Sequence, residues 1–120
     1  MRIEIRGRNV EIEPSLRSHI ERQLSFAMGR FGPRIEWLTV RVEDVNGPRG
    51  GNDKRCRIEV DLIRSKNVMV EEFDSDPYTA AARAVNRAGR SVARQLGRKP
   101  GARAGKADQL VRGASEVYSG

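Results

Sequence analysis

One stretch of the sequence decides most of the fold: it reads DPYTAAARAVNRAGRSVARQLG and covers residues 76–97. Asp76 followed by Pro77 is typical of a helix N-cap and first turn. At about 100° per residue, the apolar side chains of this stretch gather on one side of a helix: they are Tyr78, Ala81, Val85, Ala88, Val92 and Leu96. Four arginines of the stretch and the residue that follows it gather on the opposite side: they are Arg83, Arg87, Arg90, Arg94 and Arg98. The stretch therefore predicts a helix that docks by one face and presents guanidinium groups on the other.

Upstream of this helix, the sequence predicts four strands and one more helix. Apolar and polar residues alternate over residues 1–8, 38–43 and 56–62, and the short segment 68–73 predicts a fourth strand. Pro14 suits the first turn of a helix that runs to about Arg30, where Phe31, Gly32 and Pro33 end it. Its apolar stripe comprises Leu16, Ile20, Leu24, Ala27 and Phe31.

The predicted order of elements is β-α-β-β-β-α. Each strand has one apolar face and each helix one apolar stripe, so we expect both helices to cover one face of a four-stranded sheet. The fold class is an α+β two-layer sandwich. Turn-forming residues over 46–52 predict a long mobile loop between the second and third strands. We expect one domain over residues 1–98 and a flexible basic tail over residues 99–120.

Charge is unevenly distributed over the 120 residues, whose formal net charge is +7. Residues 1–34 carry +3, residues 35–74 carry −2 and residues 75–120 carry +6. No acidic residue occurs between Pro77 and Ala107, a segment that contains eight basic residues. Like charges spaced four residues apart weaken a helix, and a phosphate backbone would turn that repulsion into attraction. This distribution favours nucleic acid as the partner.

Composition excludes several other classes of protein. The longest uninterrupted apolar run is three residues, so no segment can span a bilayer, and the charged N-terminus is not a signal peptide. One cysteine and one histidine provide neither a disulfide nor a zinc cage. Cys56 falls on a core position of a strand, which predicts an inert buried thiol, and His19 is expected to be an exposed helix residue. The sequence therefore predicts no enzyme, no cofactor and no metal site.

Further basic residues lie outside the second helix. Arg2, Arg6 and Arg8 project from the polar side of the first strand, and Arg17 and Arg22 from the polar side of the first helix. Among the aromatic residues, only Trp37 is expected on the open sheet face. Recognition of folded RNA through its phosphates and shape is therefore favoured over reading bases through stacked rings.

Three stretches together resemble a known family. They are IEIRGRNVEI at 3–12, PSLR with IERQL at 14–17 and 20–24, and DPYTAA at 76–81 followed by Asn86, Arg87, Arg90 and Arg94. This set, over about residues 1–98, resembles the ribosome hibernation-promoting factor and ribosome-associated inhibitor family, also called sigma-factor modulation proteins. Ala88 and Gly89 depart from the family pattern, which indicates a divergent member with a thinner core and a looser helix. We also expect a short member, with no second domain after the tail.

The resemblance implies a cytoplasmic protein that binds the small ribosomal subunit in the mRNA and tRNA channel and silences translation under stress. By position, it implies rRNA contacts at Arg17, Arg22, Arg87, Arg90, Arg94 and Arg98. Charge alone adds Arg6, Arg8, Arg83 and Lys99 to the candidate contacts. We expect the chain to be monomeric when free, with no membrane and no small-molecule substrate as partner.

Two other functions remain open from the sequence. One is a protein-binding modulator of a transcription factor, acting through the open sheet face. The other is a module that binds structured RNA without specificity for the ribosome. Co-sedimentation with small subunits at rising salt distinguishes all three.

Overall fold

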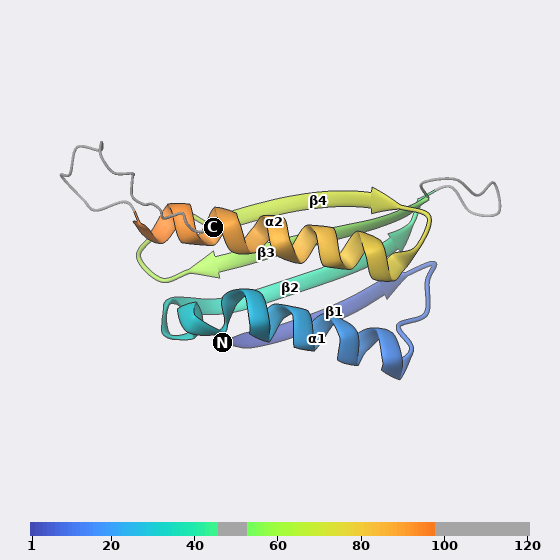
Figure 1. Ribbon diagram of the computed structural model, residues 1–120, viewed down its shortest axis with the longest axis horizontal. Coiled ribbons are helices and arrows are strands. Elements are labelled where there is room, and N and C mark those ends of the chain that lie inside the picture. The colour runs from blue at the N-terminus through green and yellow to red at the C-terminus, as the bar shows by residue number, and fades with distance from the viewer. Residues whose placement is uncertain (46–52, 98–120) are drawn as a thin grey trace.

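The computed structural model describes residues 1–45 and 53–97, which form a four-stranded sheet covered on one face by two α-helices (Figure 1). In chain order, the elements are β1 (Arg2–Arg8), α1 (Pro14–Met28), the 3-10 helix η1 (Gly29–Arg34), β2 (Ile35–Asp44), β3 (Lys54–Leu62), β4 (Val68–Asp74) and α2 (Pro77–Gly97). The predicted α+β class and the order β-α-β-β-β-α are confirmed.

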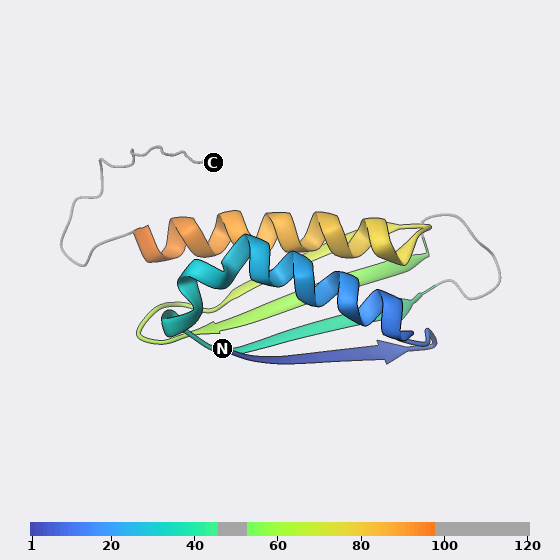
Figure 2. The same ribbon diagram turned by 60° about the horizontal axis from the view of Figure 1, so that its bottom comes forward.

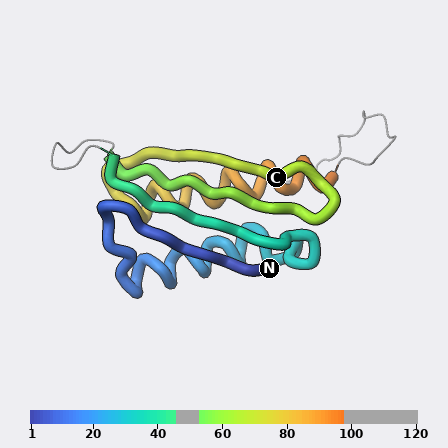
Figure 3. Tube along the Cα trace, turned by 180° about the vertical axis from the view of Figure 1, so that it is seen from behind, coloured from blue at the N-terminus to red at the C-terminus, as the bar shows by residue number. Residues whose placement is uncertain are grey.

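The strands lie in the order β1-β2-β3-β4, as the tube in Figure 3 shows from the side away from the helices. β1 runs parallel to β2, with Ile5 opposite Val40, whereas the two following pairs are antiparallel. A parallel pair needs a crossover connection, and α1 supplies it. This connection places α1 over the sheet rather than beside it (Figure 2).

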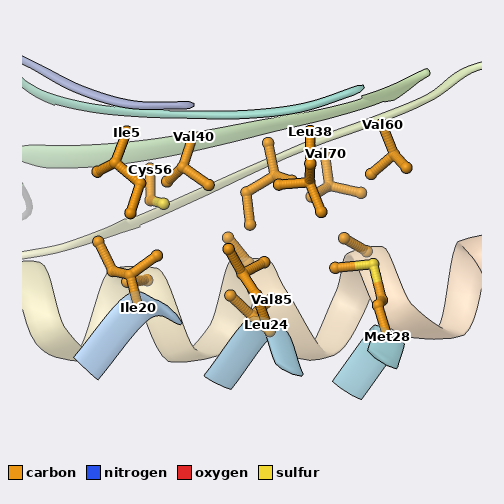
Figure 4. Packing of buried hydrophobic residues seen from close by; sticks show 14 of the residues in the cluster. Ile5, Ile20, Leu24, Met28, Leu38, Val40, Cys56, Val60, Val70 and Val85 are labelled. Carbon is orange, nitrogen blue, oxygen red and sulfur yellow. The ribbon is translucent and has the colours of Figure 1, made fainter. Parts of the chain in front are cut away.

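The core lies between the sheet and the helix layer (Figure 4). α1 contributes a fully buried stripe that includes Ile20, Leu24 and Met28, and α2 contributes Val85 among others. The strands meet them with alternate residues, so that Leu38 and Val40 of β2 point inward. Most of the inward positions predicted from alternation and helical periodicity are core positions, but the predicted stripe of α1 omitted the fully buried Met28 and included Ala27 and Phe31, which are only partly buried.

Gly89 is buried where the two helices come closest. A Cβ atom at this position would lie 3.3 Å from Cβ and 3.4 Å from the carbonyl oxygen of Ala27. Glycine weakens a helix interior by about 1 kcal/mol relative to alanine. The structure explains why glycine occurs at this position: because it has no side chain, α1 and α2 can approach each other closely.

The first helix ends earlier than the sequence predicts. Met28 has φ −132° and ψ 3°, outside the helical range, so α1 stops there and η1 follows. The segment from Phe31 to Pro33 lies inside η1 instead of ending α1. As a result, β2 begins at Ile35, three residues before the predicted start.

The start of α2 is as predicted. The backbone N–H of Tyr78 and the hydroxyl of Thr79 donate hydrogen bonds to the Asp76 carboxylate, at 3.3 and 2.9 Å. The Thr79 hydroxyl holds the pKa of Asp76 below its ordinary value, and the backbone N–H groups of Tyr78 and Thr79 act in the same direction.

Two predicted segments, the loop at 46–52 and the tail at 99–120, lie outside the described residues. Among the helices described here, none is long and apolar enough to cross a membrane.

Candidate nucleic-acid interface

The α2 arginines lie on the side of the helix that faces away from the core. Arg83, Arg87, Arg90 and Arg94 are all exposed, whereas Ala81, Val85, Ala88 and Val92 on the opposite side are buried. The predicted separation of charged and apolar faces is therefore confirmed over the described residues. Arg98 and Lys99 lie outside them.

Two of these four arginines have acidic partners on the edge strand β4. A nitrogen of Arg83 lies 3.4 Å from the Asp74 carboxylate, and one of Arg87 lies 3.1 Å from that of Glu72. Both side chains are more than half exposed, and ion pairs this exposed contribute little to stability. The pairs still lower the positive potential on this side of α2, because each guanidinium has a carboxylate beside it.

The other two arginines, Arg90 and Arg94, have no acidic partner within residues 1–45 and 53–97. Arg94 donates a hydrogen bond to the hydroxyl of Ser91, one turn earlier, at 3.2 Å. Both arginines lie further along α2 than Arg83 and Arg87, and therefore beyond the acidic residues at the C-terminal end of β4. The unpaired positive charge of α2 is therefore concentrated in its second half.

On α1, the two predicted arginines are exposed but do not point the same way. Arg17 and Arg22 are five residues apart, which separates their directions by about 140°. His19 and Ala27 contact α2 and so mark the side of α1 that faces it. Arg22 is two residues from both Ile20 and Leu24, so it points about 160° away from each of these buried side chains and faces outward from the core. Arg22 therefore joins Arg90 and Arg94 on the outer surface of the helix layer, which we call the helix face.

The first-strand arginines belong to a different surface. Arg6 and Arg8 project from β1 on the open side of the sheet, away from both helices. Arg6 pairs with the Glu4 carboxylate at 2.6 Å, and Arg8 lies 3.7 Å from that of Glu43. The structure therefore divides the predicted contacts between two opposite faces of the molecule.

The open face carries a row of arginines that the sequence analysis did not single out. Arg6, Arg41 and Arg57 occupy neighbouring register positions on β1, β2 and β3, and Glu71 of β4 completes the row. Directly opposite like charges repel, but acidic side chains border the row: Arg6 pairs with Glu4, and Arg57 lies 3.6 Å from Glu71. Strand alternation in the sequence predicts that each of these arginines faces the open side of its strand. Only the pairing register of the strands shows that they lie side by side.

Glu43 connects this row to the next one. Arg55 on β3 hydrogen-bonds to its carboxylate, and this bond, more than the nearby charges of Arg8 and Arg41, holds the pKa of Glu43 below its ordinary value. The open face is thus a mixed network of ion pairs, whereas the helix face carries arginines without them.

Aromatic side chains occur on both faces. Trp37 lies on the open face as predicted, with the Arg2 guanidinium 4.4 Å from its ring centre. The prediction that it is alone there is wrong, because Phe73 of β4 also faces this side and is 42% exposed. Phe26 on α1 was not singled out either, although it is an apolar residue outside the helical stripe.

Two reactive residue types lie apart from both surfaces. Cys56 is fully buried, and burial raises its pKa to about 12, which fits the predicted inert thiol. His19 is not the exposed residue that we predicted: its ring packs 5.1 Å from that of Tyr78, and its buried Nε2 has no hydrogen-bond partner among the described residues. The hydroxyl groups of Tyr78 and Ser15 form a hydrogen bond of 2.7 Å with each other. The His19 imidazole is therefore left packed against the Tyr78 ring.

Within the two described ranges, no group of three or more His, Cys, Asp or Glu side chains is arranged to hold a metal ion.

Comparison with known protein families matches residues 3–99 to the family described as Sigma 54 modulation protein / S30EA ribosomal protein. The chain belongs to this family. The match covers every described element except Arg2, the first residue of β1, and it confirms the resemblance inferred from the sequence. No match was found among the curated proteins.

Two solved structures show the same family fold. The Thermus thermophilus Protein Y N-terminal domain is 34% identical, with a TM-score of 0.64, and the alignment covers 78% of this chain and 98% of that domain. A ribosomal subunit interface protein from Coxiella burnetii is 18% identical, with a TM-score of 0.65, and the alignment covers 78% and 96% of the two chains. The second likeness concerns the fold alone.

Proposed function

We propose that this member of the S30EA family binds the rRNA of the small ribosomal subunit in the mRNA and tRNA channel and inhibits translation under stress. Family membership supports a ribosomal role, as does the likeness to Protein Y. The protein would act in the cytoplasm, as a monomer when free, by occupying the channel and without catalysing a reaction.

The observation that carries this proposal is the unpaired charge of the helix face. Arg22, Arg90 and Arg94 are exposed and have no acidic partner among the described residues. Guanidinium groups form forked, charge-assisted hydrogen bonds with phosphate oxygens, and each phosphate contact releases bound counterions. A surface of this kind gains most from a partner with closely spaced phosphates, such as folded rRNA.

Arg83 and Arg87 have a secondary part in this proposal. Each must leave a carboxylate on β4 before it can bind a phosphate, or share its guanidinium between the two. We therefore assign the main contacts to Arg22, Arg90 and Arg94, and place Arg17, Arg83, Arg87, Arg6 and Arg8 at the periphery.

The test is co-sedimentation with purified small subunits at a series of salt concentrations. Arg90→Gln with Arg94→Gln should flatten the slope of log affinity against log salt by about 1.4 to 1.8, because two phosphate contacts are lost. Arg41→Gln with Arg57→Gln is the matched control, since it removes the same charge from the open face. We expect this control to change the slope by less than half as much.

Three results would contradict the proposal. If the parent protein does not sediment with small subunits at low salt, the ribosomal role is wrong. If it binds an unrelated RNA duplex as tightly as it binds the subunit, the chain is a general RNA-binding module. If the control pair flattens the slope more than the helix pair, the open face is the binding surface.

A further inference from the structure

Phe26 is the large apolar side chain that the fold leaves most exposed. It is 95% exposed on α1, whereas the other exposed large apolar residues of the described chain range from 39% to 52%. Single exposed apolar residues are common, but a phenyl ring almost wholly in water contributes nothing to the core. The fold therefore gives no reason for an aromatic ring at this position.

The position of Phe26 on α1 is well defined. It follows His19 by seven residues, so the two side chains leave the helix in directions that differ by about 20°. His19 contacts Tyr78 of α2, which places Phe26 on the side of α1 nearest to α2. The next residue, Ala27, lies against Gly89 of α2, while the Phe26 ring itself stays uncovered.

Phe26 also forms one wall of a shallow open hollow in the surface of the helix layer. The hollow is lined by Arg22, Gln23, Ser25 and Phe26. Arg22 precedes Phe26 by four residues, which makes the guanidinium and the ring neighbours on the helix surface. An aromatic ring, a cation and two polar side chains at one open hollow match the chemistry of a nucleotide, with its planar base and its phosphate.

The charges around the ring decide between the candidate occupants. Arg22 and Arg90 have no acidic partner among the described residues, and Arg30 stacks 4.7 Å over the Phe31 ring. A second copy of this chain would bring the same cations against one another across the interface. RNA instead offers both a π-face for the ring and phosphates for the arginines.

We propose that Phe26 stacks on one unpaired base of the bound RNA while Arg22 holds an adjacent phosphate. This inference rests on the proposed RNA-binding role of the helix face and specifies its ligand as RNA with an unstacked nucleotide. One ring can serve one base, and stacking of this kind tolerates any base identity. The contact therefore selects RNA shape rather than sequence.

The test uses an RNA duplex of about 20 base pairs, long enough for a shape-reading domain, with one bulged 2-aminopurine nucleotide. The same duplex without the bulge is the reference. Phe26→Leu should weaken binding to the bulged duplex by about 5- to 150-fold and leave the unbulged duplex unaffected. Phe26→Trp should retain the affinity, and only ring-bearing variants should quench the 2-aminopurine emission.

Phe73→Leu provides the matched control, because it makes the same chemical change on the open sheet face and should alter neither affinity. The salt slope should be equal for the parent and Phe26→Leu, since no phosphate contact is removed.

Four results would overturn the inference: no preference of the parent for the bulge, equal weakening on both duplexes, no weakening at all, or a dimer in sedimentation equilibrium that Phe26→Leu dissociates. None of these results depends on small-subunit binding, so failure of the ribosomal role is measured separately.

Discussion

At the scale of single residues, Gly7 is the position where the fold leaves no room for a side chain. A Cβ atom there would overlap the carbonyl oxygen of Val10 and lie 2.9 Å from Cγ1 of Ile12. The chain returns over Gly7 because Asn9, at φ 58°, adopts the left-handed conformation that asparagine tolerates better than most residues. The turn after β1 therefore depends on two neighbouring residue types.

Gly7→Ala should lower the free energy of unfolding by about 1–3 kcal/mol, because the obstructing atom belongs to the backbone and cannot rotate away. Urea denaturation measures the change. Gly32→Ala is the control, since no atom beyond its immediate chain surroundings lies within 4 Å of its Cβ position. Equal losses in both variants would show that glycine flexibility, and not space, matters at position 7.

At the scale of elements, the contact of α1 with α2 and the cap of α2 determine how the helix face is presented. Both helices dock on the same side of the sheet, and the small pair Ala27 and Gly89 sets their separation. Asp76 caps the N-terminus of α2, and the buried apolar stripe of α2 determines which of its residues face outward.

Substitutions at Gly89 should show that this close approach is limited by space. Gly89→Leu should destabilise the protein by about 1–3 kcal/mol, because the larger side chain separates the helices. Gly89→Ala should be close to neutral, since its gain in helix propensity of about 1 kcal/mol opposes crowding against Ala27. Thermal unfolding of both variants tests this, and a stable Gly89→Leu protein would show that the helices can move apart without cost.

The cap residue should make part of the stability dependent on pH. The pKa of Asp76 is lowered in the folded protein, so its stabilising effect is present above the unfolded value of about 4 and is lost as the pH falls through the folded value. Asp76→Asn keeps a good cap but cannot titrate, so its melting temperature should fall less than that of the parent below about pH 4.

Asp76→Ala should melt at a lower temperature than both proteins at neutral pH. If Asp76→Asn and the parent lose stability in parallel as the pH falls, another carboxyl group is responsible for the acid sensitivity.

Local patterns predicted much of this architecture, because strand alternation and helical periodicity reflect which side chains face the core. They fixed the inward positions of α2 and the order of elements. They could not predict that Arg83 and Arg87 pair with β4, because that depends on which strand lies beside α2. Phe26 was overlooked because periodicity selects buried apolar residues and says nothing about one that stays outside. The end of α1 at Met28 depends on backbone angles that the sequence pattern does not contain.

At the scale of the whole molecule, the two faces differ in how their charge is used. The open sheet face interleaves arginines with glutamates, as in the pairs of Arg57 with Glu71 and Arg8 with Glu43. The helix face leaves Arg22, Arg90 and Arg94 without such partners among the described residues. The arginines that we assign to phosphate binding thus lie on the helix side, and we expect a polyanion to approach from there.

An inhibitor that acts by occupying a channel should be stoichiometric. In a cell-free translation system, we expect inhibition to saturate at about one protein per ribosome, and Arg90→Gln with Arg94→Gln to shift the titration to higher protein concentrations. The rRNA should remain intact on a denaturing gel. Cleaved rRNA, or inactivation of many ribosomes by one protein, would indicate a nuclease and contradict the proposed mechanism.

The position of Trp37 makes the difference between the two faces measurable by tryptophan fluorescence. Trp37 is the only tryptophan of the chain, and it lies on the open sheet face beneath the Arg2 guanidinium. Its indole emission therefore reports on the solvent at one face only. A partner that covers the helices should leave the emission wavelength unchanged. A partner that covers the open sheet face should displace water from the indole and shift the emission wavelength. The protein thus carries an intrinsic fluorophore that distinguishes the two docking orientations without any label.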